Sequence, residues 1–513
     1  MSKRGKVYLL GAGPGDPELV TLRAQRRLAE ADLVLYDALV HPDVLSHCRP
    51  DAERVFVGKR AGRASERQSE INRRMVEAAQ AGWVVARLKG GDPYLFGRGS
   101  EEAEHLAAAG IEFEVVPGVP SALAATAYAG ISLSHRELAS SIAYVTATES
   151  SLKDESAHDW SKLATATQSL VIFMGVRKLD SLMKLLMANG RPPTCPAAVI
   201  QSASLPEQRT VVGTVADIAA RASDAGIGLP ALTVVGEVVR LRERLRWYDT
   251  KPLFGLRVLV TRAEDQAASM VQALRDAGAA AVVAPAIRIA PPEDLAALAR
   301  AVRDVSGYAW LVLTSQNGVE AFFAELRAQG GDARCLGGVR VAAIGPVTAE
   351  RLREHGIEPD VVPEVYRGEA VAEAIVAAHA GVLKGVRVLL CRAAVARDAL
   401  PDALRGCGAA VDVVASYRTL PATERDQARL RTLFESSALD VVTFTSSSTV
   451  DNTLSALGPD ARRLLSGLTL ASIGPITSEA LARHGLSASV TASEYTVPGL
   501  IHALQRHRQE KRA

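Results

Sequence analysis

Short runs of β-branched and other apolar residues alternate with Ala-, Leu- and Arg-rich stretches along almost the whole chain. Four clear runs are residues 7–10, 84–88, 257–261 and 309–313. Runs of this length suit buried strands, and the longer stretches between them suit helices. Because parallel strands are joined by helical crossovers, the alternation predicts α/β domains with largely parallel sheets.

The length and composition limit the kinds of protein that this chain can be. At 513 residues it exceeds one ordinary domain and suggests roughly three or four compact units. Apolar residues make up 48% and charged residues 23%, which is typical of soluble globular proteins and excludes general disorder. The net charge of +2 leaves no large basic surplus for neutralising phosphates, so we expect no nucleic-acid partner.

The cysteines and the hydropathy pattern bear on the compartment. The five cysteines are dispersed without a Cys-x-x-Cys pair, so we expect neither a disulfide framework nor a metal site. The first residues are typical of a strand entering a glycine loop rather than of a signal peptide. The longest charge-free run, residues 115–134, is interrupted by prolines and glycines and would span a membrane poorly. We therefore expect a cytoplasmic protein without a membrane partner.

One domain boundary stands out near the middle of the chain. Residues 241–251 are rich in charge, follow an apolar strand and lead to Pro252. A new strand-turn-helix pattern begins after Gly255. We therefore expect a first domain over residues 1–247, a linker over 248–255 and a second domain over 256–508.

The second half contains an internal repeat. Residues 310–319 and 441–450 each join an apolar run to a Thr-Ser pair. Residues 341–356 and 470–485 each contain Ile-Gly-Pro-x-Thr and end in His-Gly. The two elements lie 31 residues apart in the first copy and 29 in the second. Two similar α/β lobes that face each other are the simplest explanation.

A glycine-rich loop, Gly-Ala-Gly-Pro-Gly-Asp-Pro, starts at Gly11 directly after the first predicted strand. Asp37, about twenty residues later at the end of the next strand, completes the outline of a dinucleotide fingerprint. The third glycine of that fingerprint is replaced by Asp16. A carboxylate there opposes a pyrophosphate and favours a cationic or neutral ligand. A tight turn without a ligand is the alternative, and a dehydrogenase is the weakest interpretation.

Two further loops follow strands in the same way. Gly90 and Gly91 allow a ligand to approach the backbone, and Asp92 supplies a hydrogen-bond acceptor. A third loop, residues 116–122, again places small residues between a strand and a helix. Three such loops in one domain predict a small-molecule cleft.

Eight motifs of the first half closely resemble those of uroporphyrinogen-III C-methyltransferase, over about residues 5–245. The resemblance implies two α/β subdomains with S-adenosylmethionine bound between them, usually in a homodimer. One departure is Val-Thr-Ala-Thr-Glu at residues 145–149, where the family commonly has Thr-Gly-His. The eight motifs are residues 11–17, 36–40, 57–60, 87–102, 116–136, 173–176, 208–214 and 230–239.

The resemblance also implies functional residues. Asp37 and Lys59 match the positions proposed in the family for the proton acceptor and the proton donor. Methyl transfer is a displacement at a sulfonium, so positioning dominates, and a proton must later leave the ring system. The implied cofactor contacts are Pro14, Gly90, Gly91, Asp92, Leu95, Pro120, Ser121, Met174 and Ala203.

Other roles are open at several of these positions. Asp37 is also suited to capping a helix, and Lys59 to solvent or to a substrate carboxylate. Arg63, Arg98 and Arg136 are candidate contacts for substrate carboxylates, although a single arginine is more often a surface residue.

The repeated elements of the second half resemble uroporphyrinogen-III synthase over about residues 255–505. Val-Leu-Val-Thr-Arg at residues 258–262 and Val-Ala-Ser-Tyr-Arg-Thr at residues 414–419 support the resemblance together with the repeat. It implies two flavodoxin-like lobes joined by two strands. Lobe one would comprise residues 256–285 and 418–508, and lobe two residues 286–417.

The reaction of that family closes linear hydroxymethylbilane with inversion of its last pyrrole ring. Loss of a hydroxyl gives a reactive azafulvene, and a spiro intermediate then rearranges. Tyr417 is the candidate for assisting departure of the hydroxyl. Arg262, Ser315, Ser446 and Thr477 are candidate contacts for substrate carboxylates, since hydroxyls and free N–H groups at helix starts suit anions. The alternative is that the serines and threonines only cap helices.

Together these features predict an α/β protein with a tetrapyrrole-methylase fold followed by a two-lobed flavodoxin-like synthase. The predicted function is bifunctional: formation of uroporphyrinogen III, then two methyl transfers to give precorrin-2, which feeds either siroheme or cobalamin synthesis. Two alternatives stay open. The second half would be a non-catalytic tetrapyrrole-binding module, or the first half another methylase of the same fold.

Overall fold

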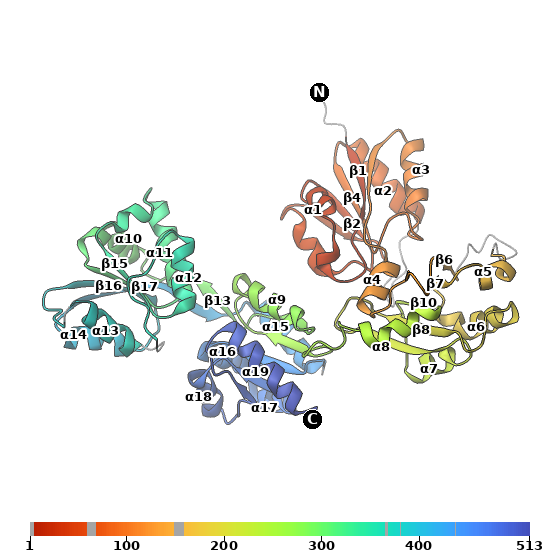
Figure 1. The fold of residues 1–513 in the computed structure, drawn as a ribbon. Helices are drawn as coiled ribbons and strands as arrows, with labels where there is room; N and C mark the ends of the chain where they lie inside the picture. Colours follow the sequence, from red (N-terminus) through yellow and green to blue (C-terminus); the bar gives the residue numbers. More distant parts are fainter. Residues whose placement is uncertain are drawn as a thin grey trace. The chain divides into compact units, whose positions relative to one another are not determined.

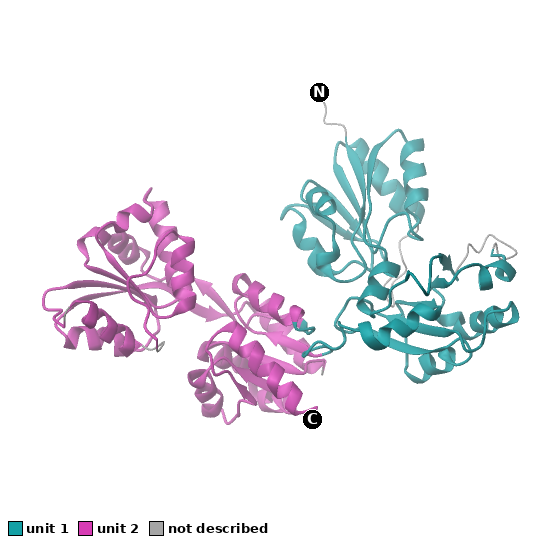
Figure 2. Cartoon of the chain, viewed as in Figure 1, with its two compact units in different colours: residues 1–255, 277–280 teal, residues 256–276, 281–513 magenta. Residues whose placement is uncertain are grey.

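The computed structural model describes residues 5–58, 68–147, 158–364, 368–379, 381–436 and 438–512. The chain forms two compact units, shown in different colours in Figure 2. Unit 1 comprises Met1–Gly255 with Ala277–Ala280, and unit 2 comprises Leu256–Asp276 with Ala281–Ala513. Four five-stranded sheets, two in each unit, organise the described residues.

The first sheet of unit 1 is parallel throughout, with the order β3-β2-β4-β1-β5. Helices cover both faces of the sheet (Figure 1), so its central strands are apolar on both sides. The strands are β1 (Lys6–Gly11), β2 (Leu33–Tyr36), β3 (Glu53–Phe56), β4 (Val84–Lys89) and β5 (Glu112–Val116). The helices that pack on this sheet are α1 (Leu22–Leu28), α2 (Gln68–Gln80) and α3 (Gly99–Ala108), whereas α4 (Ser121–Tyr128) packs in the core of the second sheet.

The second sheet of unit 1 departs from the expected parallel pattern. Its order is β6-β7-β10-β8-β9, and only β6 and β7 run parallel. The short connection between β8 and β9 accounts for one antiparallel pair, because such a pair needs only a turn, and β10 is antiparallel to both β7 and β8. The strands are β6 (Ile142–Thr146), β7 (Ser169–Phe173), β8 (Pro196–Gln201), β9 (Arg209–Thr214) and β10 (Ala231–Val235). The helices are α5 (Trp160–Ala166), α6 (Leu179–Ala188), α7 (Ile218–Asp224) and α8 (Arg242–Leu245).

Lobe one of unit 2 is built from two separate parts of the chain. Its sheet has the order β12-β11-β18-β19-β20, so the first two strands of the half lie beside the last three. The strands are β11 (Arg257–Val260), β12 (Ala280–Val283), β18 (Val441–Phe444), β19 (Thr469–Ser472) and β20 (Val490–Thr491). The helices are α9 (Ala268–Asp276), α15 (Glu424–Glu435), α16 (Ser447–Leu457), α17 (Ala461–Leu465), α18 (Pro475–Arg483) and α19 (Val497–Glu510).

Lobe two is inserted between β12 and α15, and two strands connect it to lobe one. Its sheet has the order β13-β17-β16-β14-β15, with β13 antiparallel to the last residues of the long strand β17. The strands are β13 (Ile287–Ala290), β14 (Trp310–Leu313), β15 (Arg340–Ala343), β16 (Arg387–Ala393) and β17 (Ala410–Pro421). The helices are α10 (Leu295–Arg303), α11 (Gln316–Ala328), α12 (Pro346–Glu354), α13 (Gly368–Ala378) and α14 (Ala399–Gly406).

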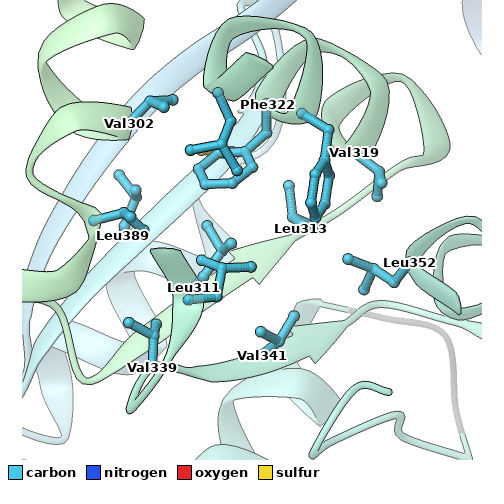
Figure 3. Close-up of a cluster of buried hydrophobic side chains, with 14 of the residues drawn as sticks. Val302, Leu311, Leu313, Val319, Phe322, Val339, Val341, Leu352 and Leu389 are labelled. Carbon is cyan, nitrogen blue, oxygen red and sulfur yellow. The ribbon is translucent and has the colours of Figure 1, made fainter. Parts of the chain in front are cut away.

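The core of lobe two explains why α11 lies where it does. Ser315 caps the helix, and its apolar face places Val319 and Phe322, both fully buried, against Leu311 and Leu313 of β14 (Figure 3). Full burial of each of these side chains contributes about 1.5–3 kcal/mol. The helix start is therefore fixed at the carboxyl end of β14. The predicted fold class is confirmed in both units.

Candidate functional sites

Three loops at the carboxyl ends of β1, β4 and β5 contact one another directly. The N–H of Gly91 donates to the carbonyl of Gly13 at 2.6 Å, and the N–H of Gly13 donates to the carbonyl of Gly91 at 3.3 Å. Gly118 of the third loop lies so close that a Cβ there would stand 2.2 Å from Gly91 O and 2.7 Å from Gly11 Cα. Any side chain at position 118 would therefore push the loops apart.

The carboxylate of Asp92 fastens the second loop to the third. Its Oδ1 accepts hydrogen bonds from the backbone N–H groups of Tyr94 (2.8 Å) and Leu95 (3.1 Å). Its Oδ2 accepts one from the N–H of Gly118 (3.0 Å). Asp92 was predicted as a hydrogen-bond acceptor, and here its carboxylate accepts from the protein backbone and shapes the loops.

The first glycine loop also reaches the second subdomain of unit 1. A Cβ on Gly15 would stand 2.7 Å from the carbonyl oxygen of Ala203, in the loop after β8. The N–H of Asp16 donates to Ser204 Oγ at 3.0 Å. Pro14 and Ala203, two of the implied cofactor contacts, therefore lie in loops that touch.

Other implied cofactor contacts gather through apolar packing. The ring of Phe96 in the second loop packs on Phe173 at the end of β7, with centroids 4.9 Å apart, and Met174 follows directly. Leu95 and Ala203 pack against one buried cluster that also contains Phe173 and the first turn of α4, where Ser121 lies. The structure thus brings the five implied segments, after β1, β4, β5, β7 and β8, into one region.

Backbone strain is concentrated in these loops. Among the described residues, five non-glycine residues have φ between 48° and 64°, and all five lie in unit 1. Phe96 and Arg98 belong to the second glycine loop, Met174 follows β7, and Ser202 and Ser204 follow β8. Such conformations cost about 1–3 kcal/mol each and persist where surrounding contacts enforce them, most often at binding sites.

Asp16, the residue predicted to oppose binding of a pyrophosphate, forms hydrogen bonds with other residues of the protein. Its Oδ1 accepts from the N–H of Glu18 (2.9 Å) and its Oδ2 from the hydroxyl of Tyr128 (2.7 Å). Burial, together with this bond, raises the pKa of Tyr128 well above its ordinary value. The hydroxyl of Tyr248 donates to the carbonyl of Ser204 (3.2 Å). The two tyrosines hold the first glycine loop and the loop after β8 in place.

Asp37 follows β2 and is half-buried. Its Oδ1 accepts from the N–H of Leu39 (3.0 Å) in a local turn, and it caps no helix, because the next helix begins at Pro42 and is capped by His41. Its Oδ2 lies 3.3 Å from the N of Gly90, which donates to it. Asp37 therefore lies against the second glycine loop.

A buried charge cluster adjoins the second loop, and the sequence prediction missed it. Arg87, Lys89 and Glu102 are each at most 4% exposed. Glu102 Oε1 accepts from Arg87 Nε (3.1 Å), Lys89 Nζ (3.0 Å) and Gln68 Nε2 (3.0 Å). Burial alone would raise the pKa of Glu102, but Arg87 and Lys89 hold that pKa below its usual range. The sequence did contain a sign of this cluster, because Arg87 and Lys89 stand two residues apart at the end of a strand that was predicted to be buried.

The candidate substrate residues of unit 1 are placed differently. Arg98 directly precedes α3 and pairs with Glu101 at 2.6 Å, with its side chain 58% exposed. Arg136 is exposed in the turn closed by the pairing of His135 with Ala139. Lys59 and Arg63 lie outside the described residues.

Unit 2 contains a cavity of about 870 Å³ lined by both lobes. Arg262, Asp265 and Gln266 line it from lobe one, and Asn317 and Tyr417 are among those that line it from lobe two. The side-chain amides of Gln266 and Asn317 form a hydrogen bond across it. The predicted pair Arg262 and Tyr417 thus meets at one cavity.

Arg262 presents a half-buried cation to this cavity. Burial lowers the pKa of its guanidinium, and Asp265 only partly opposes that effect. Among the described residues, none forms a hydrogen bond or ion pair with its side chain. Because a half-buried guanidinium without a bonded partner gains from a charge-assisted hydrogen bond, this arrangement suits a ligand carboxylate that completes the pair.

A β-bulge explains how Tyr417 reaches the cavity. Arg392 pairs with Ala415 and Ala393 pairs with Tyr417, so Ser416 is an extra residue in β17. Its hydroxyl donates to the carbonyl of Arg392 at 3.1 Å. Bulges redirect side chains, and here both Ser416 and Tyr417 line the cavity.

The predicted hydroxyl contacts act as helix caps in two cases. Ser315 Oγ accepts from the N–H of Gly318 (3.1 Å), and Ser446 Oγ accepts from the N–H of Thr449 (3.2 Å). Ser315 immediately precedes the part of α11 that lines the cavity. Ser315, Ser446 and Thr477 are themselves not among the residues that line it, and Thr477 is only 3% exposed.

Within the described part of the chain, no helix is both long and apolar enough to cross a bilayer. No three His, Cys, Asp or Glu side chains of the described residues gather in a way that could hold a metal ion.

Two family models match the chain, one in each half. The model described as "Tetrapyrrole (Corrin/Porphyrin) Methylases" matches residues 6–219. The model described as "Uroporphyrinogen-III synthase HemD" matches residues 268–502. Both families expected from the sequence are thereby confirmed.

Several characterised relatives are similar to this chain. The porphyrin biosynthesis protein HemD of Ruminiclostridium josui is 36% identical over 504 residues, which is 98% of both chains. The uroporphyrinogen-III C-methyltransferase of Bacillus subtilis is 38% identical over 70% of this chain and 74% of its own. The siroheme synthase of Acinetobacter baylyi is 49% identical, but the match covers 48% of this chain and 53% of that enzyme.

Among solved structures, the native uroporphyrin-III C-methyltransferase of Thermus thermophilus is 41% identical over 46% of this chain and 94% of its own, with a TM-score of 0.40. The complex of that enzyme with S-adenosyl homocysteine is 42% identical over 46% of this chain and 99% of its own, with a TM-score of 0.39. Given the near full-length match to the R. josui protein and the two family models in the same chain, this protein belongs to the HemD family of porphyrin biosynthesis proteins, with a tetrapyrrole methylase domain followed by a uroporphyrinogen-III synthase domain.

Proposed function

We propose that this chain catalyses two successive steps: cyclisation of hydroxymethylbilane to uroporphyrinogen III, then two methyl transfers from S-adenosylmethionine to give precorrin-2. The methyltransferase would occupy residues 1–247 and the synthase residues 256–508. The observation that carries the proposal is the presence, in one chain, of converging strained glycine loops and of a large cavity lined by a half-buried arginine that has no bonded partner among the described residues.

For methyl transfer, the glycine loops of unit 1 fit a small cofactor held by backbone groups. S-adenosylmethionine, when bound, supplies a methyl group on a positively charged sulfur. Gly11 and Gly118 leave no room for side chains between the loops, and the loop after β8 meets the first loop from the other subdomain. Such loops fix the orientation of bound molecules, which is the main requirement of a displacement reaction. Asp37, at the same loops, accepts the proton that leaves the methylated ring, and Lys59 serves as the proton donor.

For cyclisation, the cavity of unit 2 holds a linear tetrapyrrole folded so that its ends meet. Arg262 binds one of the substrate carboxylates, and Tyr417 assists departure of the hydroxyl as a proton donor. The surrounding lobes exclude water from the reactive intermediate. Ser315, Ser446 and Thr477 remain proposed carboxylate contacts, as do Arg63, Arg98 and Arg136 for the methyltransferase.

We further propose that the active form is a cytoplasmic homodimer associated through the methyltransferase half. Precorrin-2 would then enter siroheme or cobalamin synthesis.

The test is to incubate the full-length protein with hydroxymethylbilane, with and without S-adenosylmethionine. We expect uroporphyrinogen III without the cofactor and a dimethylated dihydro product with it, both identified by mass spectrometry and isomer chromatography. Formation of only the type-I isomer would contradict the synthase half and favour a tetrapyrrole-binding module. Failure to methylate added uroporphyrinogen III, with retained affinity for the cofactor, would instead indicate a methylase for another substrate.

A further inference from the structure

The turn that follows β11 presents polar side chains to the cavity of unit 2. Arg262, Asp265 and Gln266 of this turn line the cavity, whereas Ala263 and Ala267 of the same turn are at most 3% exposed. The two buried alanines anchor the turn in lobe one and leave the polar side chains to the cavity. The carboxylate of Asp265 therefore lies in the same cavity as the guanidinium of Arg262.

Hydrogen bonds hold this turn in place on both sides. Before it, Thr261 Oγ1 donates to the carbonyl of Thr443, and Thr443 Oγ1 donates to the carbonyl of Leu259, each at 2.7 Å. At its other end, the side-chain amide of Gln266 bonds that of Asn317 in lobe two. A charge on such a turn needs little reorganisation during a reaction, and fixed charges of this kind stabilise a transition state best.

Asp265 is free to contact a ligand. Its side chain is exposed, and none of the described residues forms a hydrogen bond or ion pair with its carboxylate. Two other acids of the cavity lining differ, since Glu320 Oε1 lies 2.9 Å from His355 Nε2 and Glu325 Oε1 accepts from Gln329 Nε2 at 2.7 Å. The oxygens of Asp265 are thus left for a bound molecule.

Arg262 and Asp265 influence each other without forming an ion pair. Burial lowers the pKa of Arg262, and the negative charge of Asp265 partly opposes that effect. Both charges are therefore available to one ligand that carries an anion and a hydrogen-bond donor. Each pyrrole ring of hydroxymethylbilane is such a ligand, because it bears carboxylate side chains and one N–H.

We propose that Asp265 is a catalytic residue of the synthase, which accepts the pyrrole N–H of the ring that loses its hydroxyl while Arg262 binds a carboxylate of the same ring. The inference rests on the proposed function, because it adds a residue to the cyclisation. Departure of the hydroxyl places positive charge on the ring nitrogen, and a carboxylate beside that nitrogen stabilises the charge as it develops.

Asp265 and Tyr417 together carry the protons of this step. The C–O bond breaks with its electron pair on the oxygen, which takes a proton from Tyr417 and leaves as water. Electrons of the pyrrole ring form a double bond to the exocyclic carbon, and Asp265 takes the N–H proton to give the neutral azafulvene. When the exocyclic carbon forms its new carbon–carbon bond, those electrons return to the ring and Asp265 returns the proton to nitrogen. The proton lost by the attacking carbon restores Tyr417.

The test is the steady-state kinetics of uroporphyrinogen-III formation from hydroxymethylbilane by full-length variants. Asp265→Asn keeps the size of the side chain but removes its charge, so kcat should fall by about 100-fold. KM should change by less than about threefold, because the uncharged ring of the bound substrate gains little from that charge. Asp265→Ala should lose at least as much kcat, and Asp265→Glu should recover part of it. A loss of kcat at constant KM indicates a contact made in the transition state.

Glu264→Gln is the matched control, because Glu264 precedes Asp265, is exposed and is not among the residues that line the cavity. An unchanged kcat in Asp265→Asn, a rise in KM alone, or an equal loss of kcat in Glu264→Gln would overturn the inference. Thermal unfolding reports whether each variant folds, and if Asp265→Asn does not, Asp265→Ala is judged by the same outcomes. A wild-type protein that forms only the type-I isomer would contradict the proposed function itself rather than this inference.

Discussion

The two halves of the molecule build their candidate sites in opposite ways. In unit 1, loops after five strands touch one another, and the five non-glycine residues with positive φ among those described all lie in them. In unit 2, the corresponding region is a cavity of about 870 Å³ with few polar groups bonded across it. A rigid, small cofactor is best served by pre-formed loops, whereas a long flexible polyacid needs space and a few fixed charges. Variants that change one half alone test this difference.

The largest effect is expected at the hydroxyl of Tyr417. Tyr417→Phe keeps the ring in the cavity but removes the hydroxyl proton that we propose assists departure of the substrate hydroxyl. General acid catalysis contributes about 100-fold or more, so formation of uroporphyrinogen III should fall by about that factor. The measurement is the initial rate of type-III isomer formation from hydroxymethylbilane.

Tyr308→Phe is the matched control for this change. Its hydroxyl donates to Asp412 at 2.7 Å, in the same lobe but away from the cavity lining. We expect it to alter stability without altering the isomer ratio. An unchanged synthase rate in Tyr417→Phe would show that Tyr417 is not the proton donor.

A comparable loss, confined to the other half, is expected from Gly118→Ala. The added Cβ would stand 2.2 Å from the carbonyl oxygen of Gly91, which is backbone and has no rotamer to yield. Displacement of the loops by even 1 Å costs about 100-fold in a reaction governed by positioning. Methylation of uroporphyrinogen III should therefore fall by about 100-fold, and the synthase rate should stay unchanged.

The control for Gly118→Ala is Gly228→Ala in the same unit. A Cβ at this position would make an ordinary contact, 3.4 Å from Gln201 Nε2. Equal losses of both activities in Gly118→Ala would show that the halves do not work independently.

A smaller effect, again limited to unit 2, is expected from Arg262→Met. A hydrogen bond to a charged group contributes about 1.5–3 kcal/mol, which corresponds to about 10- to 100-fold in substrate affinity. The synthase KM should rise, and more type-I isomer should form as bound substrate is lost. Arg334→Met, at a side chain 91% exposed, should leave both values unchanged. A normal synthase KM in Arg262→Met would show that Arg262 does not bind a substrate carboxylate in this cavity.

Much of this organisation could be predicted from the sequence, because it depends on local patterns. The alternation of apolar runs predicts the strands, and the internal repeat of the second half predicts the two lobes of unit 2. The repeat extends to side chains: His355 lies 2.9 Å from Glu320, and His484 lies 2.7 Å from Asp451, in equivalent helix pairs. The family motifs of the first half predicted the five loop segments that come together in unit 1.

What could not be predicted depends on contacts between distant residues. From the sequence, Asp16 is simply a charged loop residue. Its structural role depends on the hydroxyl of Tyr128, which lies more than a hundred residues later and donates to it. The bulge at Ser416 requires the register of two strands, which no local pattern contains. A serine at the start of a helix can either cap the helix or bind a ligand, and the sequence does not distinguish the two. In the structure, Ser446 Oγ accepts from the N–H of Thr449 as a helix cap.

The smallest expected effect tests whether the loops of unit 1 are truly held from outside the glycine motifs. Tyr128→Phe removes the hydrogen bond to Asp16, which contributes about 0.5–1.5 kcal/mol net, so affinity for S-adenosyl homocysteine should fall by roughly two- to tenfold. Tyr8→Phe removes a bond of the same kind and length, from its hydroxyl to Glu30 at 2.7 Å, on the first strand rather than at the loops. Calorimetry should show weaker binding only in Tyr128→Phe, while thermal unfolding should show a similar loss of stability in both variants. Equal affinities would mean that the glycine loops hold their shape without Tyr128, and that their strained backbone is enforced by the loop-to-loop contacts alone.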